Sequence, residues 1–124
     1  MKFAEFAELT GWNTATTARM CRRGYLSSGR HSGSGNHREY TTMDVAVAAI
    51  IEDTRARFNS ETSWAALDVI VPAVRSNPNV FVLVSGTTTG IYGSASEAVA
   101  AVNAAATIFD VARILEEAER VVRG

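Results

Sequence analysis

The sequence predicts an α+β fold in which residues 1–58 form a helix-rich first part and residues 60–124 form a small α/β lobe with a β-hairpin and helices. Two short helical patterns are separated by a tight turn, and a segment rich in glycine and serine follows them. After residue 60, helix and strand patterns alternate. With 124 residues, 47% of them hydrophobic, the chain can bury one modest core or two very small ones.

The first part opens with two predicted helices. Apolar residues at positions 3, 6, 7 and 9 predict a helix that stops at Thr10-Gly11. Asn13 is a good N-cap for a second helix, which runs to about Arg23 because Gly24 can adopt the left-handed conformation that ends a helix. Two short helices around a glycine-containing turn are typical of a helix-turn-helix.

The second helix is predicted to carry two different faces. Spacings of three and four residues give it a packing face made of Thr17, Met20 and Cys21. The opposite face stays free and holds Ala15, Ala18, Arg19 and Arg22. Cys21 is therefore expected to be a small buried hydrophobe, and Trp12 in the turn is expected to stack against the third helix.

A hairpin is predicted between the second and third helices. Residues 27–36 contain no hydrophobic side chain, which indicates a solvated loop. Tyr25-Leu26 before this loop and residues 37–40 after it are expected to be short strands. Together they form a hairpin, or wing, with a flexible basic tip.

Further along, Thr41 and Asp44 predict a capping box that opens a third helix reaching Phe58. The polar residues 59–63 are interpreted as the boundary between the two parts. An apolar helix is expected from Trp64 to Val74, interrupted by Pro72. The remaining expected elements are a strand at 80–85, a turn at 86–90, a short strand at 91–93, a capped helix from Ser94 to about 104, a strand at 107–111 and a helix at 112–122.

Charge is distributed unevenly along the chain. The net charge is -1, but residues 1–42 carry six basic and three acidic side chains, whereas residues 43–124 carry six basic and ten acidic ones. A basic first third joined to an acidic remainder suits a phosphate-binding module attached to an assembly or sensing module.

Several classes of protein are disfavoured by composition. Every apolar stretch is shorter than the roughly 20 residues of a membrane helix, and Glu5 and Glu8 stand where a secretory signal has an apolar run, so a cytoplasmic protein is predicted. One cysteine and two histidines give no spaced set of zinc ligands, so neither a metal nor another cofactor is expected. His31 and His37 have no nucleophile or carboxylate nearby in sequence, and no enzyme is predicted.

Two ordered groups of residues stand in the first 50 or so positions. The first is Phe3-Ala4-Glu5-Phe6-Ala7, followed by Thr10-Gly11. The second consists of Thr16, Arg22, Gly24, Leu26, Gly35, Arg38, Tyr40, Thr41 and Asp44. In this order and spacing they resemble the winged-helix DNA-binding domain of the MerR family, whose Thr-Gly turn corresponds to Thr10-Gly11, and the resemblance covers about two fifths of the chain. Beyond Phe58 the sequence lacks sustained heptads, so the family's metal site and drug pocket are not implied.

The resemblance and the free helix face lead to one expectation about function. Residues 1–58 are expected to bind double-stranded DNA, with the second helix in the major groove and the wing on the backbone or minor groove. The expected contact residues are Asn13, Thr14, Ala15, Ala18, Arg19, Arg22, Arg23, Arg30, His31, His37, Arg38 and Tyr40. The protein is then a sequence-specific transcriptional regulator, with any small-molecule effector undetermined.

A homodimer through residues 60–124 is also expected. The strand at 80–84 is apolar on both faces, and a lobe this small has little to cover the second face except another copy. Two other functions stay open, an excisionase-like architectural DNA-binding protein and a protein-interaction module that reuses the winged helix. Residues 85–90 are interpreted as a hairpin turn rather than a phosphate-binding loop.

Overall fold

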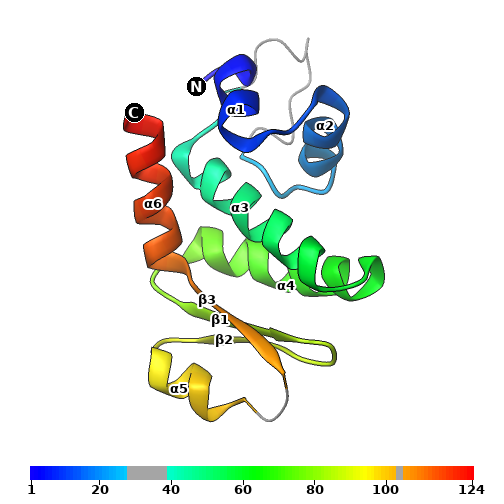
Figure 1. Ribbon diagram of the computed structural model, residues 1–124, viewed down its shortest axis with the longest axis vertical. Coiled ribbons are helices and arrows are strands. Elements are labelled where there is room, and N and C mark those ends of the chain that lie inside the picture. Colours follow the sequence, from blue (N-terminus) through cyan, green and yellow to red (C-terminus); the bar gives the residue numbers. More distant parts are fainter. Residues whose placement is uncertain (28–38, 103–104) are drawn as a thin grey trace.

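The computed structural model describes residues 1–27, 39–102 and 105–124 of the chain and confirms a mixed helix and sheet architecture (Figure 1). The elements are α1 (Phe3–Thr10), α2 (Thr14–Arg22), α3 (Thr42–Arg57), α4 (Ser60–Ser76), β1 (Phe81–Ser85), β2 (Thr89–Tyr92), α5 (Ala95–Ala100), β3 (Ala106–Asp110) and α6 (Val111–Arg123). In Figure 1, α1 and α2 lie above α3, the sheet lies below α4, and α6 rises beside α3.

The turn between α1 and α2 forms as the sequence predicts. Gly11 ends α1 in the left-handed region at φ 75°, and the side chain of Asn13 accepts a hydrogen bond from the Thr16 amide to cap α2. Gly24 follows α2 at φ 79°. Asn13 and Gly24 thus mark the two ends of α2, a nine-residue helix that is too short to be stable alone.

The polar residues 59–63, interpreted as the boundary between the two parts, belong mostly to α4, which starts four residues before the expected Trp64. Asn59 caps α4 by accepting from the Thr62 amide, so the helix begins at Ser60 directly after α3. Pro72 does not interrupt α4. Val71 and Val74 are buried on either side of it, and this packing holds the helix together despite the missing amide donor.

The strands expected to flank the wing do not form in the described residues. Tyr25 donates its amide to the Met20 carbonyl and, like Leu26, is buried, so it continues the end of α2 instead of starting a strand. Tyr40 pairs with the chain's first residue, because its amide donates to the Met1 carbonyl and its carbonyl accepts from the Met1 amine. The expected basic tip of the wing, residues 28–38, lies outside the described residues.

The sheet is antiparallel in the order β2-β1-β3, and β1 and β2 form the predicted hairpin. Val82 and Val84 point toward α4 and are fully buried. Leu83, on the opposite face, is also buried, because α5 packs there and contributes the buried Ala98. Leu83 therefore needs no second copy to cover it, contrary to the expectation for this face, because α5 packs over β1 (Figure 1).

One core joins α1, α3, α6 and the inner face of the sheet, and it does not include α5. It includes Phe6 from α1, Ile51 from α3, Val82 from β1 and Ala118 from α6. The core thus continues across residues 58–60, because α3 packs against both α4 and α6. As a result, α1 and α2 are mounted on the same packed body as the sheet.

Candidate nucleic-acid interface

The outer face of α2 is the candidate interface. Thr17, Met20 and Cys21 are buried, which confirms the predicted packing face. The residues turned outward are Thr14, Ala15, Arg19 and Arg22, with Ala18 half-buried among them. The small residues near the start of α2 leave room for close approach, and the arginines near its end can reach around a bound surface.

The positive charge of this face is not neutralised. Residues 9–38 contain no aspartate or glutamate at all. Among the ion pairs of the described residues, none involves Arg19, Arg22 or Arg23. Exposed cations without a neighbouring carboxylate create a field that attracts anions such as phosphates.

Arg55, which sequence reasoning missed, extends this charge onto the corner between α3 and α4, where it meets Trp64. The guanidinium carbon of Arg23 lies 3.9 Å from the ring centroid of Trp64, and that of Arg55 lies 5.1 Å from the same ring. Both distances fall within cation–π range. The sequence offered no usable signal, because Arg55 and Trp64 belong to no motif and meet only when α3 and α4 fold against each other.

A buried tyrosine ties the end of α2 to α4. The Tyr25 hydroxyl donates to the Asp68 carboxylate, and its ring lies beside Trp64. Burial, reinforced by the bond to Asp68, raises the pKa of Tyr25 to about 12. Tyr25 therefore stays a neutral hydrogen-bond donor at physiological pH, and α2 keeps a fixed position relative to α4.

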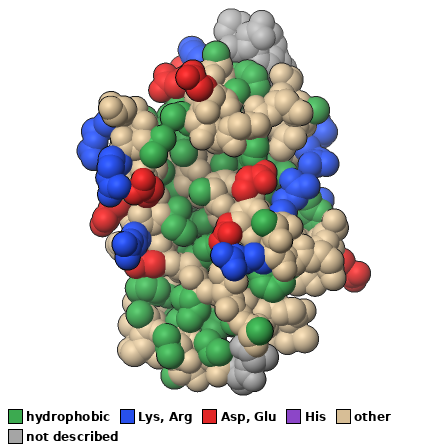
Figure 2. Space-filling view, viewed as in Figure 1, with side chains coloured by type: hydrophobic (Ala, Val, Ile, Leu, Met, Phe, Trp, Pro, Cys, Tyr) green, Lys and Arg blue, Asp and Glu red, His purple; other side chains and the backbone are tan. Residues whose placement is uncertain are grey.

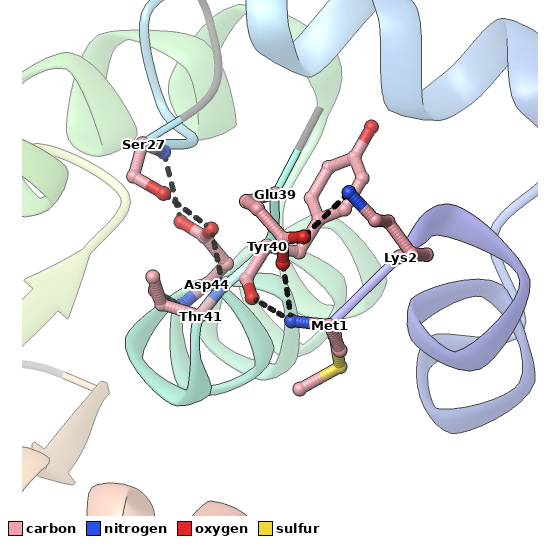
Figure 3. A network of polar contacts seen from close by, with 7 residues as sticks. All are labelled: Met1, Lys2, Ser27, Glu39, Tyr40, Thr41 and Asp44. Carbon is pink, nitrogen blue, oxygen red and sulfur yellow. Dashed lines mark hydrogen bonds and ion pairs between the residues drawn. The ribbon is translucent and has the colours of Figure 1, made fainter. Parts of the chain in front are cut away.

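Ser27, which follows the end of α2, is held by the buried carboxylate of Asp44 (Figure 3). Asp44, fully buried, accepts hydrogen bonds from the Ser27 amide at 2.9 Å and hydroxyl at 2.6 Å, and from the Thr41 amide at 2.9 Å. Arg75 of α4 pairs with the same carboxylate and also donates to the Tyr25 carbonyl. Sequence analysis found the cap between Thr41 and Asp44 but not Ser27 or Arg75.

These donors decide the charge state of Asp44. Burial is the strongest single influence and by itself raises the pKa of Asp44. The hydrogen bonds from Ser27, Thr41 and Arg75 together outweigh it and hold this pKa below its usual value. Asp44 is thus an anion at neutral pH, and it neutralises Arg75 inside the fold.

Glu39, which precedes α3, is held by the first two residues of the chain (Figure 3). Glu39 pairs with the Met1 amine at 2.9 Å and with Lys2 at 2.6 Å. Hydrogen bonds from Lys2 and from the amine lower the pKa of Glu39 to about 2. Ser27 and Glu39 are therefore anchored separately, Ser27 by Asp44 and Glu39 by Met1 and Lys2.

Not every expected contact residue is available on the surface. Tyr40 is 3% exposed and its ring stacks on Phe6 at 4.5 Å between centroids, so it is a packing residue and its assignment as a contact is corrected. The side-chain oxygen of Asn13 serves as the α2 cap. Arg30, His31, His37 and Arg38 lie outside the described residues.

The two residues assigned to packing behave as predicted. Cys21 is buried in the core. Trp12 is buried against α3, where its indole nitrogen donates to the Glu52 carboxylate at 2.6 Å.

Among the described residues, no group of three or more His, Cys, Asp and Glu side chains is placed to hold a metal ion. No helix among them is long and apolar enough to cross a membrane.

Comparison with protein-family models, with curated proteins and with solved structures finds no match to this chain.

Proposed function

We propose that the protein binds double-stranded DNA through α2 in the manner of a winged helix-turn-helix, as a dimeric regulator of transcription. One observation carries the proposal. The exposed face of α2 joins small side chains at its start to Arg19 and Arg22 at its end, and no ion pair of the described residues involves either arginine. This arrangement suits a helix that enters the major groove while its arginines meet phosphates or a guanine edge.

The surroundings of α2 support the same proposal. Arg23 and Arg55, which both lie over the Trp64 ring, add positive charge that can follow a DNA backbone past the groove. The predicted wing residues Arg30 and Arg38 belong to the stretch that Ser27 and Glu39 bracket. A duplex docked on α2 is therefore expected to meet Arg23 and Arg55 beside the end of the helix.

The dimer has support on the outer side of the sheet. On the face where α5 packs, Phe81 and Ile108 stay only half-buried. Val99 in α5 is 62% exposed, and Val102 just after α5 is 42% exposed. A second copy packed over this apolar surface would remove it from water. Two copies related by a two-fold axis then present two α2 helices to inverted half-sites.

Sedimentation velocity of the full chain, alone and with a labelled duplex of about 30 bp, tests both parts of the proposal. We expect the free protein to sediment at twice the mass of one chain and to bind the duplex at low salt. Binding should weaken steeply as salt rises, because each neutralised phosphate releases counterions.

Matched variants assign the surface. Val99→Asp should give a monomer, whereas Val121→Asp, a similarly exposed valine on α6, should leave the dimer intact. Absence of duplex binding at low salt would exclude DNA binding and favour the protein-interaction module. Binding accompanied by strong bending of the duplex, measured by energy transfer between its ends, would favour the architectural alternative.

A further inference from the structure

An open apolar groove lies between α1, α3 and α6, away from the outer face of α2. Its volume is about 440 Å³, within the range of pockets that hold small organic molecules. Figure 2 looks onto this side of the molecule, and hydrophobic side chains gather in the hollow between α6 on the left and the helices on the right. The groove is distinct from the proposed DNA-binding surface.

The groove exists because small residues line its floor. Ala48 of α3 and Ala118 of α6 are buried there, and neither side chain is long enough to fill the space between the helices. Leu9 of α1 and Ile114 of α6 form the walls, while Val121, 43% exposed, stands at one end. A hydrocarbon placed in the groove would cover apolar surface that water now touches.

The charged groups at the rim of the groove are all negative. Glu52 of α3 and Glu117 of α6 line the groove, and none of its lining residues, all of them described, is Lys, Arg or His. Glu117 already pairs with Arg120 on the outer side of α6. Glu52 takes part in none of the ion pairs of the described residues, and it accepts a hydrogen bond from the indole of Trp12. A carboxylate above an apolar floor is complementary to a hydrocarbon with a positively charged end.

We propose that this groove binds an apolar amine, a small molecule with a hydrocarbon body and an ammonium group that pairs with Glu52. The body lies over Ala48 and Ala118, and the ammonium sits at the acidic rim. Neutral and anionic molecules of the same shape bind less well, because only a cation gains the attraction of the carboxylate.

A molecule bound in the groove is expected to affect the turn that precedes α2. Glu52 holds the indole of Trp12, and Trp12 directly precedes Asn13, the cap of α2. An ammonium on Glu52 competes with that indole for the carboxylate. The amine is therefore an effector whose binding changes the surroundings of Trp12.

Trp12 provides the readout. The chain has two tryptophans, so Trp64→Phe leaves Trp12 as the only tryptophan, whose emission is followed by excitation at a wavelength that tyrosine does not absorb. This variant of the full chain is titrated with n-octylamine, 1-octanol and octanoate, which share one hydrocarbon tail and differ in charge. At pH 7 the amine is protonated, as a lysine side chain is. We expect a saturable change in Trp12 fluorescence as octylamine is added. Octanol should bind at least about fivefold more weakly than octylamine, and octanoate more weakly still.

Two variants and a control decide the assignment. Glu52→Gln keeps an acceptor for Trp12 but removes the charge, so it should reduce octylamine binding to the level of octanol. Glu119→Gln makes the same charge change on the outer side of α6 and should have little effect. Ala118→Leu fills the floor and should abolish binding of all three molecules, with its folding checked by thermal melting.

Equal binding of octylamine and octanol, unchanged by Glu52→Gln, would overturn the proposal, as would the absence of saturable binding by octylamine. None of these measurements involves DNA. A failure of the proposed DNA binding therefore leaves this test intact, and a failure here leaves the proposed DNA binding untouched.

Discussion

The helices α2 and α6 both expose arginines, yet the balance of positive and negative charge on their surfaces differs. α2 presents Arg19 and Arg22 and contains no acidic residue, whereas α6 has three arginines and three glutamates, with Arg120 paired to Glu117. Figure 2 shows blue and red side chains together along the left flank, where α6 lies. Arginine content alone therefore does not mark a phosphate-binding surface; arginines without neighbouring carboxylates do.

Both helices pack through an apolar face, with Met20 of α2 and Ala118 of α6 buried in the same core. The chain leaving α2 is held in addition by polar groups, since Tyr25 is bonded to Asp68 and Ser27 to Asp44. Apolar packing tolerates a change of pH, while a buried carboxylate does not. The surroundings of α2 are thus the more sensitive part of the molecule.

The largest effect is expected when the polar support of α2 is removed. Asp44→Ala leaves Arg75 without its buried partner and removes the acceptor for Ser27 and Thr41, so it should destabilise the protein by about 3 kcal/mol. Asp53→Ala, on the same helix, breaks only the exposed pair with Arg57 and should cost less than about 1 kcal/mol. Urea unfolding at pH 7 measures both. Equal losses would mean that the Asp44 network does not support the fold.

The same residue sets a pH dependence with a defined sign. Because the pKa of Asp44 is lowered in the folded state, its contribution to stability is present above the unfolded value of about 4 and is lost as pH falls below it. The difference in unfolding free energy between wild type and Asp44→Asn should therefore shrink from pH 7 to pH 3. A difference that grows on acidification would contradict the assignment.

A smaller effect is expected when the two helices are compared directly. Arg22→Ala on α2 should weaken binding to any duplex by about three- to tenfold and make the salt slope shallower by about one unit, as expected for one lost phosphate contact. Arg120→Ala on α6 removes the same charge from an arginine already paired and should change neither quantity. Fluorescence anisotropy across a salt series measures both variants. If Arg120→Ala weakens binding as much as Arg22→Ala does, net charge, and not the face of α2, accounts for it.

Local signals account for the parts of the fold that the sequence predicted well. Asn13, Gly24 and the pair Thr41 and Asp44 act within four residues of their partners, and the helix ends they predict are confirmed. The helix expected from Trp64 in fact starts at Ser60, because a polar stretch suits a boundary between parts and a capped helix start equally well. The expected wing strand at Tyr25 failed because Tyr25 and Leu26 are buried beside α2, which a pattern of alternating residues cannot reveal.

The candidate site shows the same limit. The outward face of α2 follows from helical spacing alone and was predicted correctly. Arg75 lies 31 residues from Asp44, and Trp64 lies in a different helix from both Arg23 and Arg55. Such contacts depend on how α3 and α4 pack, which no local spacing encodes. Tyr40 was misassigned because a motif position says nothing about which side of the fold a ring faces.

The smallest effect is expected at the corner between α3 and α4. Arg55 is held over Trp64 and takes part in none of the described ion pairs, so Arg55→Ala should weaken duplex binding by about two- to threefold if the corner touches the backbone. Arg57→Ala is the matched control, because Arg57 lies two residues away on the same helix but is neutralised by Asp53. Anisotropy at low salt resolves the difference. A twofold change for Arg55 and none for Arg57 would extend the uncompensated surface of α2 onto α3, whereas equal affinities for both variants and wild type would confine it to α2.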